Sequence, residues 1–304
     1  MPSKRSLLNG VDKPLIFPTY DGSGQCVHPD ILRVRRRYLD AEFLMVAEPY
    51  PFADDYLENP SLFVSSDGVS WAVPTGVSNP IVAEPERRGS WHSDGDLILH
   101  GDSALYLYYR FNSGAGETTC LLTRSEDGIR WTQPEPLFQF QVSGRFASPA
   151  VIERGSRYSM FFVDTIARTV RVRHSPDGRR WFEESEVLQF PGAWHLDAIS
   201  WEGRIYLLLN ASKALFLLRS LDLETWEILS ADGWRRFARP AEAVSGRAGS
   251  SWLPLLAPSG HGWDDQEIYR STFLIEDGEI RLWYGAKSSG NQWNVGYISG
   301  QLPS

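Results

Sequence analysis

A seven-residue phrase recurs four times along this chain of 304 residues. Each copy has a serine, any residue, an aspartate, usually a glycine, two further residues and a tryptophan. The copies occupy residues 65–71, 125–131, 175–181 and, in a degraded form, 220–226, so that the tryptophans are 60, 50 and 45 residues apart. A strand-rich unit repeated at this spacing is typical of a β-propeller, in which small sheets surround a central channel.

Apolar and aromatic runs around these phrases predict up to four strands in each repeat. The first strand of a repeat is expected at five places, which are residues 30–34, 96–100, 149–153, 197–201 and 271–275. In the phrase itself, a serine or aspartate side chain can accept hydrogen bonds from nearby backbone N–H groups, and the glycine can adopt a positive φ. We therefore interpret the phrases as structural turns that close a hairpin, with the tryptophan packed across it.

The predicted fold is all-β, a single five-bladed propeller domain spanning residues 1–304. The chain ends soon after the third strand of the fifth repeat, so we expect residues 13–17 to complete the last blade and close the ring. A β-sandwich would also show alternating strands, but five similar repeats favour the propeller. The segment from about 232 to 268 is too long for a normal connection, and its tryptophans predict an ordered insert near the channel mouth.

Composition and charge exclude several classes of protein. A net charge of −8 argues against nucleic acid as a partner, and no apolar stretch is long enough to span a membrane. Residues 1–9 show no signal peptide, so a cytoplasmic location is expected, with phage association or another export route as the alternative. The two cysteines, Cys26 and Cys120, are too few for a disulfide scaffold and are expected to be buried thiols. The oligomeric state is left open.

In a propeller the first strands line the channel, and here their beginnings are strongly polar. Candidate residues at these positions are His28, Asp30, Trp91, His92, Asp94, Ser148, Trp194, His195, Asp197 and Arg270. Carboxylates held close together separate each other's pKa values, which is the arrangement that acid–base hydrolysis of a glycosidic bond requires. The neighbouring tryptophans offer flat rings for sugar faces. Whether Asp94 or Asp96 faces the channel is left open, because residues two apart in a strand point to the same side of it.

A second set of polar residues lies at strand ends or in the long insert. Glu48, Arg110 and Asp164 end the second strands of three repeats, Glu58 precedes a third strand, and Trp263 and Glu267 lie in the insert. Polar residues that differ between repeats, while their neighbours stay apolar, are typical of a substrate pocket. We therefore predict Glu48 and Glu58 as further catalytic candidates and the others as substrate-binding residues.

The residues at the strand beginnings resemble those of the five-bladed propeller glycosidases, the clan that contains glycoside hydrolase families 43, 32 and 117. The likeness rests on His28-Pro29-Asp30, Ser93-Asp94, Ser148-Pro149 and the run from Trp194 to Asp197. It implies Asp30 as base or nucleophile and Asp94 as an orienting or pKa-tuning residue. The general-acid glutamate of the clan has no counterpart at the first strand of the third or the fourth repeat, so Asp197, Glu48, Glu58 or Glu267 would have to serve as the acid.

The resemblance also implies that a calcium ion could occupy the channel, with His195 or His261 contributing. No metal-ligand spacing is visible in the sequence, so no cofactor is expected.

The function predicted from these residues is hydrolysis of a polysaccharide or oligosaccharide by a glycosidase using carboxylate acid–base chemistry. The alternatives are a non-catalytic carbohydrate-binding propeller, such as a lectin-like or phage-tail module, and a protein-interaction propeller. Two carboxylates roughly 5 to 9.5 Å apart in one pocket would favour the enzyme, whereas a broad apolar face would favour protein interaction.

Overall fold

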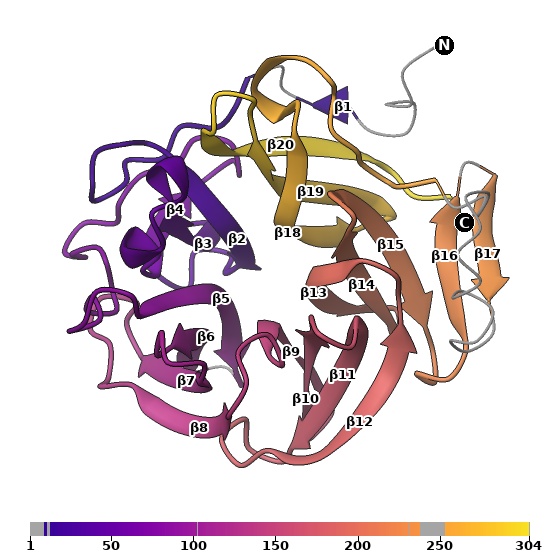
Figure 1. Cartoon of the computed structure of the whole chain (residues 1–304), viewed down its shortest axis with the longest axis horizontal. Helices are drawn as coiled ribbons and strands as arrows, with labels where there is room; N and C mark the ends of the chain where they lie inside the picture. The colour runs from indigo at the N-terminus through magenta and orange to yellow at the C-terminus, as the bar shows by residue number, and fades with distance from the viewer. Residues whose placement is uncertain (1–8, 11–12, 102, 231, 238–252, 304) are drawn as a thin grey trace.

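A computed structural model describes residues 9–10, 13–101, 103–230, 232–237 and 253–303. In this part of the chain, five antiparallel sheets stand around a central axis like blades (Figure 1), and the chain forms them one after another. The predicted five-bladed all-β propeller is therefore confirmed. Three short 3₁₀ helices lie in connections: η1 (Pro51–Ala53), η2 (Asp55–Leu57) and η3 (Gly262–Asp264).

The innermost strand of each blade borders the channel (Figure 1), and these five strands are β2 (Cys26–Arg33), β5 (Trp91–His100), β9 (Ala147–Arg154), β13 (Ala193–Trp201) and β18 (Glu267–Glu276). The second strands are β3 (Phe43–Pro49), β6 (Ala104–Asn112), β10 (Arg157–Asp164), β14 (Arg204–Ala211) and β19 (Glu279–Lys287). The third strands are β4 (Ser61–Ser65), β7 (Thr118–Ser125), β11 (Thr169–Ser175), β15 (Ala214–Ser220) and β20 (Trp293–Gln301). Outer strands are β8 (Glu135–Phe140), β12 (Phe182–Gln189) and β16 (Trp226–Ser230). Each inner strand begins two to five residues earlier than predicted, which brings the candidate site residues inside the strands.

The ring is closed by the N-terminus, as expected, although the closing strand lies earlier in the chain than predicted. Strand β1 (Asn9–Gly10) pairs antiparallel with β20 in the fifth blade. Residues 13–17 form no strand, but the N–H of Leu15 donates to the carbonyl of Val295 at 2.8 Å. Leu15 and Phe17 are buried between the fifth and first blades. The closing segment therefore combines a short strand with an apolar anchor.

The recurring phrase forms the same turn in the first four blades. In the first copy, the hydroxyl of Ser65 accepts from the N–H of Gly68 at 2.8 Å, and Asp67 accepts from two further backbone N–H groups. Gly68 has a φ of 81°, and a side chain there would meet Trp283 at 2.9 Å. The indole of Trp283 donates to the carbonyl of Gly68 at 2.6 Å. The turn thus closes its own hairpin and also ties the fifth blade to the first, which supports its structural interpretation.

The apolar cores lie between the blades. In the described part of the chain, five clusters of buried apolar residues each combine side chains from two neighbouring sheets. Alternating residues of each twisted sheet point to opposite faces, so each blade contributes to two clusters. The burial of these side chains holds the blades in a fixed ring and thereby fixes the positions of the inner strands.

The long segment after the fourth blade contributes a fifth strand to that blade. Strand β17 (Gly233–Phe237) pairs with β16 at the outer edge of the sheet, far from β13 and the channel (Figure 1). This part of the predicted insert is therefore not a wall of the mouth. Residues 238–252 lie outside the described residues, and the part from 253 onward returns to pair Leu256 with Leu215 before β18 begins. None of the described helices is long and apolar enough to cross a membrane.

Candidate functional site

The inner strands of the first three blades bulge at one equivalent position near the channel mouth. His28, Asp94 and Ser148 occupy it, with φ values of 49°, 58° and 51°, and the strand pairing skips a residue around each of them. Residues other than glycine rarely adopt positive φ, and each instance costs about 1 kcal/mol or more. Bulges of this kind redirect side chains next to functional sites. Three such bulges at equivalent positions of the propeller direct polar side chains toward a common centre.

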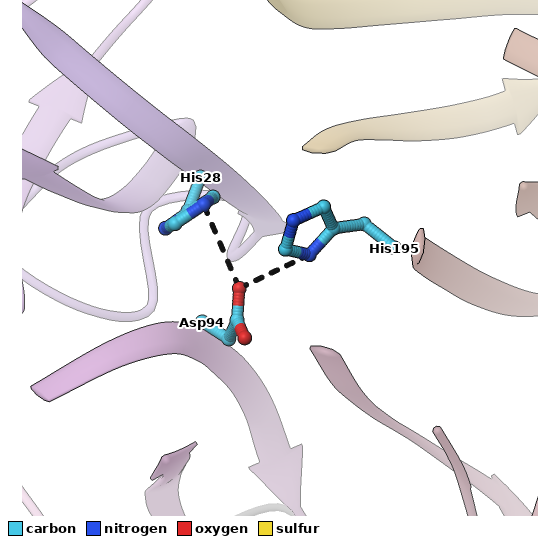
Figure 2. Close-up of side chains that lie close together, drawn as sticks. All are labelled: His28, Asp94 and His195. Atoms are coloured by element: carbon cyan, nitrogen blue, oxygen red, sulfur yellow. Dashed lines mark ion pairs between the residues drawn. The ribbon is translucent and has the colours of Figure 1, made fainter. Parts of the chain in front are cut away.

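Asp94 lies between two imidazole rings at this centre (Figure 2). Its Oδ1 atom is 3.7 Å from Nε2 of His28 and 3.4 Å from Nδ1 of His195. His28 and Asp94 come from bulges of the first and second blades, and His195 comes from the fourth, so the ring closure brings together residues far apart in sequence. We call His28, Asp94 and His195 the mouth cluster.

The second carboxylate oxygen of Asp94 is held by a residue of its own blade and by one of the next blade. It lies 3.1 Å from Nε of Arg110 and accepts from the N–H of Ser148 at 3.1 Å. Burial alone would raise the pKa of Asp94, but the positive charge of Arg110, followed by the contacts with His28 and His195, holds it well below its usual range. Asp94 is therefore an ionised carboxylate in a site closed to solvent.

Two glutamates flank the opposite nitrogen of His28. Its Nδ1 atom is 3.0 Å from Glu48 and 3.2 Å from Glu58. Glu48 also accepts from the N–H of Gly95 at 3.0 Å, and a side chain at Gly95 would lie 2.8 Å from Val46. Glycine at this position lets the backbone approach the carboxylate. These contacts direct the Nδ1 side of His28 toward the glutamates and its Nε2 toward Asp94.

The Glu58 carboxyl differs electrostatically from Asp94. Burial, followed by the negative charge of Glu48, raises the pKa of Glu58 well above its ordinary value. The mouth thus holds one carboxylate kept ionised and one carboxyl whose protonated form is favoured. Such a separation of pKa values between neighbouring groups is typical of sites that transfer protons.

Three buried atoms of the mouth cluster lack a hydrogen-bond partner within the described residues. They are Nε2 of His28, Oδ1 of Asp94 and Nε2 of His195. The three residues can each offer a ligand atom such that all lie within 4.8 Å of one another. Burial lowers the pKa of His195 to about 3, which keeps its imidazole neutral. Neutral imidazoles and an ionised carboxylate are the protonation states that bind metal ions. The mouth cluster could therefore hold a divalent cation.

The other predicted catalytic aspartates lie two residues further along the inner strands, in a separate ring. Asp30 accepts from the N–H of Leu97 at 2.7 Å, and Asp197 accepts from the N–H of Phe273 at 3.2 Å. Asp96 makes the same bond to Val151 at 3.0 Å. Each carboxylate thus joins its inner strand to that of the next blade. We call Asp30, Asp96 and Asp197 the clasp aspartates.

The clasp aspartates also repel one another. Burial and then the charges of neighbouring aspartates raise the pKa of Asp30 and of Asp96, and burial raises that of Asp197 to about 6. The guanidinium of Arg270, which is 1% exposed, offsets this charge and donates to the carbonyl of Gly95 at 2.7 Å. The structure therefore places Asp30, Asp197 and Arg270 below the mouth cluster, where they bind strands together.

This arrangement answers which aspartate of the second blade faces the mouth. Asp94 joins the mouth cluster and Asp96 joins the clasp, although regular alternation would put both on one side of the strand. The bulge between Ser93 and Asp96 separates them.

Two other predicted substrate-binding residues are tied to the scaffold. His92 is buried, with its Nδ1 atom 3.1 Å from Oδ1 of Asn59 and its ring against Tyr109. Asp164 is also buried and accepts from the N–H groups of Ile166 and Ala167, at 3.0 and 2.9 Å. These contacts indicate that both side chains stabilise the local fold.

The two tryptophans at the strand beginnings differ in surroundings. Trp194 is 40% exposed, and its indole donates to the hydroxyl of Tyr269 at 3.3 Å. Trp91 is half-buried at the start of β5. The ring of Tyr269 packs against those of His28 and His195, with centroids 5.2 and 4.4 Å apart. Sequence reasoning did not select Tyr269; its only signal was its place beside Arg270 at the fifth inner strand.

The two candidates from the long insert lie apart from the mouth cluster. Trp263 stacks on Tyr284 within the fifth blade, with centroids 5.4 Å apart. Glu267 forms a loose ion pair with Lys213, in which the charged atoms are 3.8 Å apart.

Comparison with known proteins finds relatives of the same architecture, and no family model matches the chain. An A type blood N-acetyl-α-D-galactosamine deacetylase of Flavonifractor plautii is 27% identical over 99% of this chain. The chain spans about half of that relative, 46% of its length.

Solved structures agree on the fold. An N-acetylgalactosamine deacetylase from F. plautii, in complex with blood group B trisaccharide, aligns with a TM-score of 0.81 at 22% identity, covering 97% of this chain and 95% of that one. An α-L-arabinanase from Penicillium chrysogenum aligns with a TM-score of 0.60 at 11% identity, covering 96% and 98%. A family-43 β-1,3-galactosidase, which carries the designation BT0265, aligns with a TM-score of 0.60 at 9% identity, covering 95% and 59%. The predicted resemblance to the family-43 propellers is thus confirmed at the level of the fold, and the proteins that this chain resembles process carbohydrates.

Proposed function

We propose that this protein is a carbohydrate-active hydrolase that removes the acetyl group from an N-acetylated amino sugar, with a divalent cation held by His28, Asp94 and His195. One observation carries the proposal: His28, Asp94 and His195 can each offer a ligand atom within 4.8 Å of the others, and each has a buried polar atom without a hydrogen-bond partner. Buried polar groups are normally satisfied, so such a set calls for an occupant. The deacetylase named for the relative gives the reaction type. The proposal departs from the sequence-based expectation of a glycosidase without a metal.

The residues present fit a cation better in the mouth cluster than in the clasp. Two imidazole nitrogens and one carboxylate oxygen suit zinc or another first-row divalent metal, and they leave positions open for substrate. Glu48 next to Nδ1 of His28 matches the carboxylate that commonly orients a metal-binding histidine. Ser148 has its hydroxyl 2.6 Å from Nδ1 of His195 and can orient that ring. The clasp aspartates already accept backbone N–H groups and face Arg270.

Amide hydrolysis at the mouth would use the flanking residues as follows. A divalent cation there would polarise the acetyl carbonyl and make water a better nucleophile. Glu58 takes a proton from the attacking water and returns it to the amine nitrogen, as the new C–O bond forms and the C–N bond breaks. The raised pKa makes the ionised form of Glu58 a stronger base for the first step, and the protonated form that results is the acid for the second. Arg110 keeps Asp94 ionised throughout, and the products are acetate and the free amino sugar.

The test is to incubate the protein with oligosaccharides that contain N-acetylgalactosamine or N-acetylglucosamine and to measure free acetate. Acetate release that depends on a divalent cation, and that is lost in Asp94→Asn and Glu58→Gln, is the expected result. Asp127→Asn is the matched control, because its carboxylate lies in a surface turn and accepts the N–H groups of Ile129 and Arg130. Absence of acetate from every substrate, with and without added metal, would overturn the proposal.

One observation favours hydrolysis of a glycosidic bond as a second candidate. The ionised Asp94 and the raised pKa of Glu58 form the pair of unlike carboxyl groups that glycosidases use. On this alternative the same incubation yields new reducing ends and no acetate. Saccharide binding without either product would instead indicate a non-catalytic carbohydrate-binding propeller.

A further inference from the structure

A second cavity opens near the mouth, between the fourth and fifth blades. It has a volume of about 240 Å³, the space of roughly eight water molecules. All seven lining residues are polar: Lys213, Gln266, Glu267, Lys287, Ser288, Ser289 and Asn291. The chain has only four lysines against 26 arginines, and two of the four line this cavity. We call it the lysine pocket.

Backbone hydrogen bonds fix the three segments that form the lysine pocket. The turn between β14 and β15 is joined to β18 by a bond from Ile268 N–H to the carbonyl of Lys213, at 3.1 Å. The end of β19 is joined to the start of β18 by a bond from Gln266 N–H to the carbonyl of Lys287, also at 3.1 Å. The pocket is therefore part of the rigid scaffold.

One layer of aromatic rings separates the lysine pocket from the mouth cluster. Nζ of Lys287 lies 5.3 Å from the ring centroid of Trp293, and that ring is 5.0 Å from Tyr269. Tyr269 in turn packs on His28 and His195. Trp293 and Tyr269 thus connect Lys287 of the pocket to the histidines of the mouth cluster.

An exposed aromatic residue is bonded to one of the lining residues. Asn291 donates from its side chain to the carbonyl of Phe52 at 3.2 Å, and Phe52 is 61% exposed. A flat ring beside hydroxyl and amide groups suits one face of a sugar. A docking site for another protein would be expected to be apolar across its centre, unlike this lining.

The charges of the lysine pocket favour an anion. Its side chains bring two positive charges and one negative charge, that of Glu267. Glu267 pairs loosely with Lys213, whose side chain is 60% exposed. Lys287 has no ion pair with a carboxylate among the residues that the structure describes, and it rests over Trp293. Ammonium groups of this kind act as point charges for carboxylate, sulfate or phosphate.

We propose that the lysine pocket is a subsite for an anionic sugar unit, bearing a carboxylate or a sulfate ester, next to the amino sugar bound at the mouth. This rests on the proposed function for the position of the reacting unit. The substrate class would then be an acidic polysaccharide or oligosaccharide in which an N-acetylated amino sugar alternates with, or is linked to, a charged unit.

The test is calorimetric binding of three disaccharides, each with an N-acetylhexosamine: one linked to a uronic acid, one to a sulfated hexose and one to a neutral hexose. At low salt we expect the charged disaccharides to bind at least about fivefold more tightly than the neutral one, which is the scale of one partly exposed charge pair. Lys287→Gln and Lys213→Gln should each remove most of that preference, as should high salt. The uronate and sulfate ligands distinguish the two sources of charge.

Lys13→Gln is the matched control, since Lys13 is an exposed lysine away from the pocket. Thermal unfolding of each variant checks that folding is intact. Equal affinity for all three disaccharides, or a preference that survives both pocket substitutions, refutes the subsite. Acetate release is measured separately. Lysine-dependent binding without acetate release would support the subsite and reject the proposed deacetylation. Acetate release with binding that does not depend on the lysines would support the deacetylation and reject the subsite.

Discussion

Replacing Asp94 by asparagine tests the cation site without changing the shape of the side chain. An asparagine can keep one acceptor for Arg110 or for the N–H of Ser148, but it presents an amide in place of the charged oxygen that faces His28 and His195. We expect this variant to fold and to lose the stabilisation that a divalent cation gives the wild type.

The size of both effects follows from the structure. A ligand at 100 times its dissociation constant stabilises the folded state by about 2.7 kcal/mol. For 304 residues, an unfolding entropy of about 2.1 cal/mol/K per residue gives about 0.64 kcal/mol/K, so the melting temperature should rise by about 4 °C. Without the cation, the variant should melt about 5 °C lower. Arg110, whose side chain is only 15% exposed, loses its carboxylate partner at a cost of about 3 kcal/mol.

The assay is thermal unfolding of metal-free protein, titrated separately with zinc, manganese and calcium. Asp30→Asn is the informative control, because it removes the same charge from the clasp, the second group among the described residues whose ligand atoms lie close enough to hold a metal. We expect Asp30→Asn to keep the 4 °C rise. A rise that persists in Asp94→Asn but disappears in Asp30→Asn would refute the placement of the cation, and no rise in the wild type with any metal would refute the site.

Three further outcomes are expected. Glu58→Gln should keep the melting temperature within a few degrees, because it replaces a carboxyl whose protonated form is favoured, yet lower acetate release by about 10² or more. Asp67→Asn should cost at most about 1 kcal/mol at pH 7. Partial burial raises the pKa of Asp67, but the N–H groups of Ser70 and Val69 lower it to about 2. The stabilisation by the ionised carboxylate therefore exists above about pH 4 and is lost as the pH falls toward 2. Acid unfolding curves of the wild type and the variant should converge over this range. Arg270→Met should lower the free energy of unfolding by about 3–5 kcal/mol at pH 8 and by less at pH 5. The clasp aspartates have raised pKa values, so they bind protons as the pH falls and need the positive charge of Arg270 less. An equal loss of stability at both pH values would contradict this account.

The fold could be predicted from the sequence because its signals are local and repeated. The phrase at residues 65–71 specifies a turn through contacts within three residues, and the second and third strands of the first four blades follow directly from apolar runs beside such turns. Ring closure was also predictable, since the fifth blade lacked a strand. The exact closing residues were not, because β1 contributes only two residues and its pairing depends on β20.

The site was only partly predictable, because it depends on bulges that shift the strand register. His28, Asp94, His195, Glu48 and Glu58 were all among the predicted residues, and the structure brings them together. The sequence could not separate them from the clasp. A bulge inserts one residue into the pairing, and no residue type marks it here as glycine would. The lysine pocket was not predicted as a site, although Glu267 was among the predicted substrate-binding residues, because its lining comes from three segments that are adjacent only in the folded ring.

The hydrogen bonds below the mouth explain why aspartates recur along the inner strands. In four of the five blades, a side chain at the clasp position accepts a backbone N–H from the following blade, with Thr272 serving Ile31 where the ring closes. The third blade has Ala150 there, and the N–H that it leaves, that of Ala198, is accepted by Asp197 of the same strand at 2.7 Å. All five N–H groups are therefore satisfied by side chains. A buried N–H without a partner would cost about 1–3 kcal/mol. The residue type at the clasp position is therefore constrained by the bond that it makes to the next blade. At the position two residues earlier, Asp94 also accepts the N–H of Ser148 from the following blade at 3.1 Å. The side chains at this position nevertheless differ between blades, and three of them form the mouth cluster.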